Sequence, residues 1–471
     1  MNKYHSTISR REFIKALGLG GAGLGASALL TPAFRDLDEA MASPLAEFKR
    51  PSWVKEVNKP TVEIDWAMMG QDPYDGANCM WEKGYVKAVG QHVANTTTAL
   101  GAENRIKWMK ENKPGFTKAD WAFNQSRRFF KTPDYLNPGI QTFLGPQTAP
   151  TLTSLGLPRY EGTPEENARM IRTFLKVHGC SEVAFCELDT DTTEKILYKC
   201  DAGGIPYFVR DQDQPEEVIN PQGNSYRVIP KKARYVIVYT IRMAPELLRR
   251  VPTYLSYRAA FIIYEQQCLV QSWLQEFMRA LGYMCLGWHR ITSSLGSTTG
   301  FGVMAGLGEM GRTMHLITPE HGQTERVFCA ITDLPLAPGK PVDFGAFNFC
   351  RTCKKCADLC PSGSLSRDTE PTWEKMGFYQ RSGVRAWWRY EPGCRSWMYL
   401  VDNSCGVCIA VCPFSKLYQA PYHDVVRTIT STTPAFNRFF RKTDDFMGYG
   451  MRTEEEIEKF WDMDQPPWGY Y

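Results

Sequence analysis

Two cysteine-rich runs constrain the fold of this chain more than any other feature. The first run, CRTCKKCADLCP, spans residues 350–361 and has the spacing C-x2-C-x2-C-x3-C-P. The second run spans residues 394–413 and is a stretched copy with the spacing C-x10-C-x2-C-x3-C-P. Close C-x2-C pairs wrap one short backbone segment around an inorganic cluster, and runs that end in Cys-Pro are typical of two-cluster ferredoxins. The spacing therefore predicts two [4Fe–4S] clusters.

The ligand sets of the two clusters are predicted to cross between the runs. In two-cluster ferredoxins the fourth cysteine of each run binds the cluster of the other run. We assign the first cluster site to Cys350, Cys353, Cys356 and Cys412, and the second cluster site to Cys394, Cys405, Cys408 and Cys360. Zinc sites usually combine two C-x2-C pairs rather than triplets closed by Cys-Pro. Disulfides suit exported proteins, but two dense runs that both end in Cys-Pro argue against them.

The N-terminal stretch has the layout of a twin-arginine export signal. Arg10 and Arg11 precede the weakly apolar run ALGLGGAGLGASALL, and Ala40-Met41-Ala42 follows as a small-x-small cleavage site. The apolar run is too short to span a bilayer. We therefore expect residues 1–42 to direct export. Because this route carries folded proteins, clusters can be assembled before the protein leaves the cytoplasm.

Charge and composition narrow the classes of partner. The 55 Lys and Arg residues nearly balance the 51 Asp and Glu residues, which leaves a formal net charge of +4. Composition thus gives no case for nucleic acid as a partner. A chain of 471 residues is long enough for a large core and two or more structural units.

The pattern along the chain changes near residue 160. The preceding residues are rich in Pro, Gly and Trp without a strong period, which favours an irregular wrapping segment. Helical spacing then predicts helices over 164–178, after a cap at Thr163, and over 255–281, with a buried stripe of Ile263, Val270, Leu274, Phe277 and Leu281. Apolar and β-branched runs predict strands at 182–188, 233–243 and 326–336, a weak strand at 297–304, a short helix at 303–312 and a strand at 315–318.

These features predict an α/β (α+β) protein. The expected organisation is a signal at 1–42, a wrapping segment at 43–155, a core at 156–344, a ferredoxin-like unit with two [4Fe–4S] clusters at 345–416 and a C-terminal tail at 417–471.

An ordered set of short motifs resembles one known family. LGY lies at 281–283, AGLGE at 305–309 and TDLPL at 332–336, with Arg326 six residues before the last motif. Both cysteine runs follow, and the export signal precedes them. Together these motifs resemble the respiratory reductive dehalogenases over most of residues 160–416 and at both ends.

The resemblance implies a nitroreductase-like core that holds a corrinoid, a cobalamin-type cofactor, in the base-off form. This sequence has no D-x-H-x-x-G motif to offer a histidine as a lower cobalt ligand. The glycines of AGLGE, Gly306 and Gly308, could let the backbone approach a large planar ligand, although turn and helix-end roles explain them equally well. A G-x-G-x-x-G spacing also occurs here, but its context does not support nicotinamide binding.

The family's proton donor is a tyrosine assisted by a cation. Tyr264, on the helix before LGY, matches the tyrosine, and Arg326 matches the arginine. Tyr254 and Tyr257 are close competitors, and a core tyrosine with a surface arginine is the simpler alternative. Many members carry an Asn or Lys between GY and AGLGE. This chain has neither there, so His289, Arg290, Thr292 or Ser293 would take that position.

The activity implied is removal of halide from a haloalkene or haloarene in anaerobic organohalide respiration. Implied partners are the organohalide, a small integral-membrane anchor protein and a membrane electron donor, at the outer face of the cytoplasmic membrane; a homodimer is left open. Two alternatives stand beside this interpretation. One is an enzyme similar to the epoxyqueuosine reductases, and the other is an exported iron–sulfur carrier without chemistry of its own.

Overall fold

The computed structural model describes most of the chain beyond its N-terminal stretch. The described residues are 50–71, 78–80, 82–126, 142–201, 203–220, 223–289, 294–402, 405–416 and 421–469. The predicted export signal at 1–42 lies outside them. Residues Trp53–Tyr471 form one compact unit, which contains all the elements described below.

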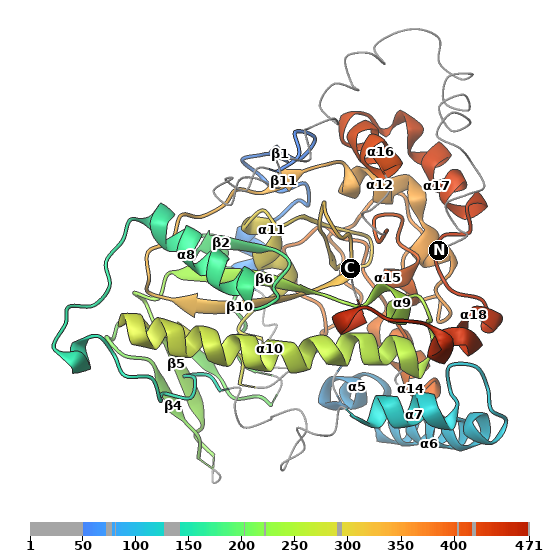
Figure 1. Ribbon diagram of the computed structural model, residues 1–471, viewed down its shortest axis with the longest axis horizontal. Coiled ribbons are helices and arrows are strands. Elements are labelled where there is room, and N and C mark those ends of the chain that lie inside the picture. Colours follow the sequence, from blue (N-terminus) through green and yellow to red (C-terminus); the bar gives the residue numbers. More distant parts are fainter. Residues whose placement is uncertain are drawn as a thin grey trace, which may run out of the picture. The chain divides into compact units, whose positions relative to one another are not determined.

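A four-stranded antiparallel sheet forms the centre of this unit (Figure 1). Its order is β2 (Val183–Glu187), β6 (Tyr235–Arg242), β10 (Glu325–Thr332) and β7 (Cys285–Leu286). The strands predicted from β-branched runs are thereby confirmed for β2, β6 and β10. Alternate residues of β6 enter different cores, Ile237 and Ile241 on one face and Val236 and Val238 on the other. Both faces of the sheet are therefore covered.

Two predicted helices cover one face of this sheet. They are α8 (Pro164–Val177) and α10 (Tyr254–Leu281), whose apolar sides join a single core with β6. The cap at Thr163 is confirmed, because its side chain accepts a hydrogen bond from the Glu166 backbone N–H and its own backbone N–H donates to the Glu166 carboxylate. The predicted stripe on α10 is also confirmed: Ile263, Val270 and Leu274 are buried, and Phe277 and Leu281 are half-buried.

The other face is covered by a helix where a weak strand was predicted. Residues 298–304 form α11 (Thr298–Met304), and the predicted short helix at 303–312 is mostly turn followed by β8 (Glu309–Met310). Both predictions are wrong. The Ser297 side chain caps α11 by accepting from the Gly300 N–H, and Phe301 is fully buried. Local capping and packing thus override the low helix propensity of Thr and Gly. β8 pairs with β9 (Leu316–Ile317), so the strand expected at 315–318 is present.

The segment before residue 155 is helical over much of its described length, so the expectation of an irregular segment is wrong. It contains α4 (Trp66–Gln71), α5 (Glu82–Val89), α6 (Gln91–Lys110) and α7 (Lys118–Gln125). α6 lacks an apolar stripe because it docks on α14 (Glu391–Leu400) through small residues: a Cβ on Gly101 would lie 2.1 Å from the Tyr399 carbonyl oxygen. The start of this segment does lie against a distant part of the chain, because β1 (Lys55–Glu56) pairs with β11 (Val342–Asp343).

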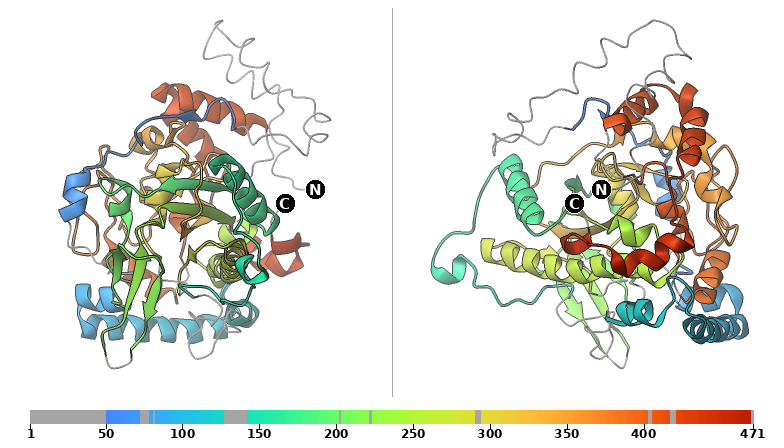
Figure 2. Two further views of the ribbon diagram at one scale, coloured as in Figure 1. Left: turned by 90° about the vertical axis from the view of Figure 1, so that its left-hand side faces the viewer. Right: turned by 45° about the vertical axis from the view of Figure 1, so that its right-hand side comes forward.

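Short helices carry the cysteine runs. α12 (Ala346–Cys353) and α13 (Lys355–Asp358) hold Cys350, Cys353 and Cys356 of the first run, and α14 and α15 (Val407–Ala410) hold Cys394 and Cys408 of the second. The tail forms α16 (Pro421–Thr432), α17 (Asn437–Phe446) and α18 (Glu454–Glu458). A small sheet of β3 (Tyr207–Arg210), β5 (Tyr226–Pro230) and β4 (Glu216–Val218) stands apart from the central sheet (Figure 2).

Candidate active site and cluster sites

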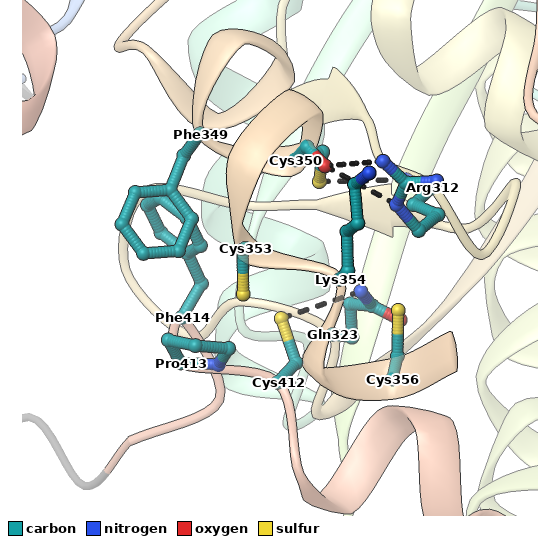
Figure 3. Close-up of a pocket in the computed structure, with 10 residues that line it drawn as sticks. All are labelled: Arg312, Gln323, Phe349, Cys350, Cys353, Lys354, Cys356, Cys412, Pro413 and Phe414. Carbon is teal, nitrogen blue, oxygen red and sulfur yellow. Dashed lines mark hydrogen bonds between the residues drawn. The ribbon is translucent and has the colours of Figure 1, made fainter. Parts of the chain in front are cut away.

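Four cysteines from both runs meet around one pocket (Figure 3). α12 supplies Cys350 and Cys353, α13 supplies Cys356, and Cys412 follows α15. The remaining lining residues are Arg312, Gln323, Phe349, Lys354, Pro413 and Phe414. The structure thus brings together the four residues assigned to the first cluster site, including the one that crosses from the other run.

The cysteines of the second cluster site also lie close enough together to raise one another's pKa. Burial raises the pKa of Cys408, and the neighbouring thiols of Cys405, Cys394 and Cys360 add to this effect. The two sites adjoin, because Cys408 also contributes to the raised pKa of Cys356 after burial and the thiols of Cys350 and Cys412. This proximity suits electron transfer from one cluster to the other.

The chemistry of these donor sets fits iron–sulfur clusters. Metal-bound cysteines are thiolates, and burial raises the pKa of each thiol at the first cluster site. A buried group of four thiolates therefore needs a bound positive centre. Within the described ranges, no three His, Cys, Asp or Glu side chains are arranged around a single metal ion. A four-iron cluster differs in this respect, because each of its cysteines binds its own iron atom.

A buried carboxylate holds the start of the first cysteine helix. Glu309 is 1% exposed and accepts hydrogen bonds from the backbone N–H groups of Phe344 and Ala346, both at 2.9 Å, and of Phe347 at 3.1 Å. Thr61 of the wrapping segment donates to it at 2.8 Å. Anions are stabilised at helix N-termini, so Glu309 positions α12 and its cysteines. Sequence reasoning missed this role, which depends on contacts between distant segments.

The structure places Tyr264 and Arg326 side by side. Tyr264 is half-buried on α10, and the Arg326 guanidinium carbon lies 5.8 Å from the centre of its ring. The rings of Phe261 and Phe328 approach Tyr264 edge-on, with centroids at 5.8 and 6.1 Å. Arg326 Nε is buried and has no hydrogen-bond partner among the described residues. The pair therefore combines a phenol, a cation and an apolar wall.

The competing tyrosines have other surroundings. Tyr254 is fully buried and donates to Asp402 at 2.8 Å, and Asp402 also pairs with Arg105 at 2.6 Å. Burial raises the pKa of Tyr254, and Asp402 raises it further. This tyrosine is thus part of a structural contact between α10 and α6. Tyr257 packs its ring 4.8 Å from that of Phe261.

An unpredicted histidine, His315, is close enough to Arg326 and to Gln323 of the first cluster site to interact with both. His315 is half-buried, and burial, followed by the charges of Arg389 and Arg326, lowers its pKa to about 3. It is therefore neutral at physiological pH. It also hydrogen-bonds with Gln323, which lines the first cluster site.

His289 belongs to a buried network of charged side chains. Its Nε2 lies 3.1 Å from Asp201 Oδ2, and Arg227 approaches the same carboxylate at 2.8 Å. The other candidates for the polar position, Arg290, Thr292 and Ser293, lie outside the described residues.

Backbone conformation and close packing explain why the two AGLGE positions, Gly306 and Gly308, are glycine. Gly306 has φ +80° and turns the chain after α11. A Cβ on Gly308 would lie 2.0 Å from the Ile317 carbonyl oxygen of β9. Their predicted contact with a planar cofactor stays a prediction, because these internal contacts already require the residues to be small.

Comparisons with known proteins agree with this fold and donor set. A family model described as "Reductive dehalogenase subunit" matches residues 49–336, and one described as "4Fe-4S double cluster binding domain" matches residues 349–415. The chain therefore belongs to the reductive dehalogenase family.

Similar proteins extend over the whole chain or parts of it. A chloroethene reductive dehalogenase of Dehalococcoides mccartyi (strain VS) is 29% identical and covers 100% of this chain and 99% of its own length. A tetrachloroethene reductive dehalogenase of Sulfurospirillum multivorans is 34% identical over 50% of this chain and 46% of its own. The solved structure of the catabolic reductive dehalogenase NpRdhA matches with a TM-score of 0.60 at 18% identity, over 88% of this chain and 51% of that chain. This chain spans about half the length of that solved chain and shares its fold.

Proposed function

We propose that this protein replaces a halogen of an organohalide by hydrogen. The organohalide takes up two electrons and one proton and yields the C–H product and a halide ion. The observation that carries the proposal is the Tyr264–Arg326 pair, in a chain whose family membership and grouped cysteines point to reductive chemistry. The eight cysteines of the two cluster sites would hold the [4Fe–4S] clusters that deliver the electrons one at a time.

Tyr264 supplies the proton in this proposal. The Arg326 charge favours a phenolate over a phenol, so it makes Tyr264 a better acid and stabilises the anion left after proton transfer. Phe261 and Phe328 form an apolar wall beside the hydroxyl-bearing ring. Such a wall suits an apolar organohalide and keeps bulk water from competing as the proton source.

A base-off corrinoid is the proposed partner of this site. One solved reductive dehalogenase of the same fold is described as suggesting a mechanism for B12-dependent dehalogenation. Arg326 Nε and His315 Nδ1 are buried without hydrogen-bond partners among the described residues, which fits a polar ligand beside them. When bound, the corrinoid would supply low-valent cobalt as the reductant of the carbon–halogen bond. The base-off form is carried over from the family resemblance, and this chain has no D-x-H-x-x-G motif to supply a histidine as the lower cobalt ligand.

Chlorinated ethenes are the substrate class we favour. Relatives that match nearly the whole chain are named as chloroethene and trichloroethene reductive dehalogenases. Haloarenes are the alternative class, and the aromatic wall near Tyr264 suits both.

The location and partners follow from the N-terminus and from electron supply. We propose twin-arginine export and peripheral attachment to the outer face of the cytoplasmic membrane through a small membrane anchor, with a membrane electron donor. No helix in the described ranges is long and apolar enough to cross a membrane.

Cofactor extraction together with a substrate panel tests the function. We expect the purified protein to release a corrinoid and to dechlorinate chlorinated ethenes with reduced methyl viologen. Iron–sulfur absorbance without corrinoid and without turnover would support the electron carrier instead. Similarity to an epoxyqueuosine reductase covers 25% of this chain, and activity on an epoxyqueuosine-containing RNA with no halide release would favour that alternative.

A further inference from the structure

A buried arginine that forms no ion pair with any described residue lies against the first cluster site. Arg312 is 1% exposed, and its backbone N–H donates to Cys350 Sγ at 3.4 Å. Its guanidinium donates to the backbone carbonyls of Cys350 at 2.6 Å and of Ser366 and Asp368, both at 2.8 Å. Within the part of the chain that the structure describes, no Asp or Glu side chain forms an ion pair with it. Buried charges are normally paired, but the carboxylate of Asp368 acts on Arg312 only from a distance and after the thiols of Cys350, Cys356 and Cys353.

The anion that fits this position is the first cluster. A [4Fe–4S] cluster with four thiolate ligands carries a net negative charge, and Arg312 interacts with Cys350, Cys356 and Cys353. Two buried lysines near this site already have acidic partners. Lys416 pairs with Asp444 at 2.6 Å, and Lys355 pairs with Asp445 at 3.0 Å. Among the buried cations that the structure describes around this site, Arg312 is thus one that forms no ion pair and can balance the cluster, and the half-buried Lys354 also lines the pocket.

The arginine at the second cluster site is neutralised. Arg389 interacts with Cys394 and Cys408, but its Nη2 lies 3.6 Å from Glu391 Oε1. Glu391 is buried and also accepts from the Cys79 N–H at 3.0 Å. The second cluster therefore lies near a paired guanidinium and the first near an unpaired one.

Hydrogen bonds from side chains to the cysteine sulfurs do not distinguish the two cluster sites, because both sites have them. Gln323 Nε2 donates to Cys412 Sγ at 3.4 Å, with its Oε1 held by Thr313 at 2.8 Å. At the second site Ser362 Oγ lies 3.4 Å from Cys360 Sγ. The Trp397 side chain interacts with the Cys405 thiol and lowers its pKa, although burial raises that pKa more. Because each site has side-chain donors, the difference between them is one of charge.

We propose that Arg312 gives the first cluster the higher reduction potential of the two, and that Glu391 keeps the second cluster lower by neutralising Arg389. This inference rests on the two-cluster function proposed above. Reduction adds an electron to an already negative cluster, so a nearby unpaired cation stabilises the reduced state, and net charge and hydrogen bonds at the sulfurs set such potentials. Electrons would then rest on the first cluster before they pass on. Arg312 acts as a tuning residue and does not bind iron.

Redox titration of the cluster-loaded protein, followed by electron paramagnetic resonance, tests the proposal without any organohalide. We expect Arg312→Met to make the higher-potential cluster about tenfold harder to reduce, which corresponds to about 59 mV for a one-electron couple. Arg312→Lys keeps the charge and should shift it less. Glu391→Gln should act in the opposite direction and make the other cluster easier to reduce. Gln323→Leu should lower the same signal as Arg312→Met, because it removes a donor to Cys412.

The signs of these shifts decide the outcome. If Arg312→Met moves the lower-potential signal, or neither signal, at unchanged iron content, the proposal is wrong. If Arg312→Met fails to retain clusters, Glu391→Gln and Gln323→Leu decide: two potentials unchanged by both variants overturn it. A protein that lacks two cluster signals would contradict the two-cluster function itself, and that result is distinguishable from two signals that do not shift.

Discussion

At the scale of single residues, the proposed chemistry depends on one hydroxyl group. Tyr264→Phe removes that hydroxyl and little volume, so the Phe261 and Phe328 contacts should survive. General acid catalysis is typically worth about 10²–10⁴-fold, and we expect turnover to fall by that factor at matched corrinoid and iron content. Tyr257→Phe is the matched control on the same helix and should retain most activity. The reverse ranking of the two variants would move the proton donor to Tyr257.

The surroundings of Asp201 lead to a second prediction at the scale of single residues. Burial alone would raise its pKa, but hydrogen bonds from His289, the Ile205 backbone and Arg227 more than offset this, and the net pKa is lowered. A carboxyl group with a lowered folded-state pKa stabilises the fold above its unfolded pKa, about 3.9, and this stabilisation is lost as the pH falls further. The network joins the β3–β5–β4 sheet to the segment after β7.

We therefore expect Asp201→Asn to destabilise the protein by about 3 kcal/mol at pH 7, since it removes the charged partner of His289 and one of the two carboxylates that pair with the buried Arg227. The difference from wild type should narrow as the pH falls below about 4. Thermal unfolding across this pH range measures both effects. A difference that stays constant down to pH 3 would show that the Asp201 charge contributes nothing to stability.

At the scale of helices and strands, prediction from the sequence succeeded for those elements whose buried residues recur at a regular spacing. β6, β10 and α10 bury residues at regular spacing, so the sequence alone reveals them. It could not reveal α6, which docks by Gly101 against the backbone of α14 instead of by an apolar stripe. It also missed α11, whose formation depends on the Ser297 cap and on packing of Phe301 against distant segments.

Gly308 gives a prediction at this scale. Its Cβ position lies 2.0 Å from a carbonyl oxygen of β9, and backbone atoms cannot move aside as a flexible side chain can. We expect Gly308→Ala to cost at least the roughly 1–3 kcal/mol typical of overpacking and to lower the melting temperature. Gly70→Ala in α4 is the control, because its nearest contact is the flexible end of Lys195. Normal stability with loss of bound corrinoid alone would instead place Gly308 at the cofactor.

At the scale of the whole molecule, the cysteine spacing predicted which residues meet, because eight ligands in two short runs leave few arrangements. The groups that surround the clusters could not be predicted in this way. Glu309, Arg312 and Gln323 reach the cysteine runs only through tertiary contacts. The same limit applies to the Tyr264–Arg326 pair, which family resemblance suggested and which the packing of α10 on β10 brings together.

The crossed ligand sets predict the effect of single cysteine changes. We expect Cys360→Ala to damage the second cluster, and Cys412→Ala the first, although each residue belongs to the other run in sequence. Iron content and the two paramagnetic signals measure this. Loss of only the first cluster in Cys360→Ala would mean that each run serves its own cluster.

The central claim is that this protein exchanges a halogen for hydrogen with electrons from its clusters and a proton from Tyr264. The most direct measurement is turnover of a chlorinated ethene in deuterium oxide with a reduced dye, with counts of chloride and of deuterium in the product. We predict one deuterium at carbon for each chloride released by replacement. Chloride release with oxygen rather than deuterium at that carbon, or no release from the cofactor-loaded protein, would contradict this claim.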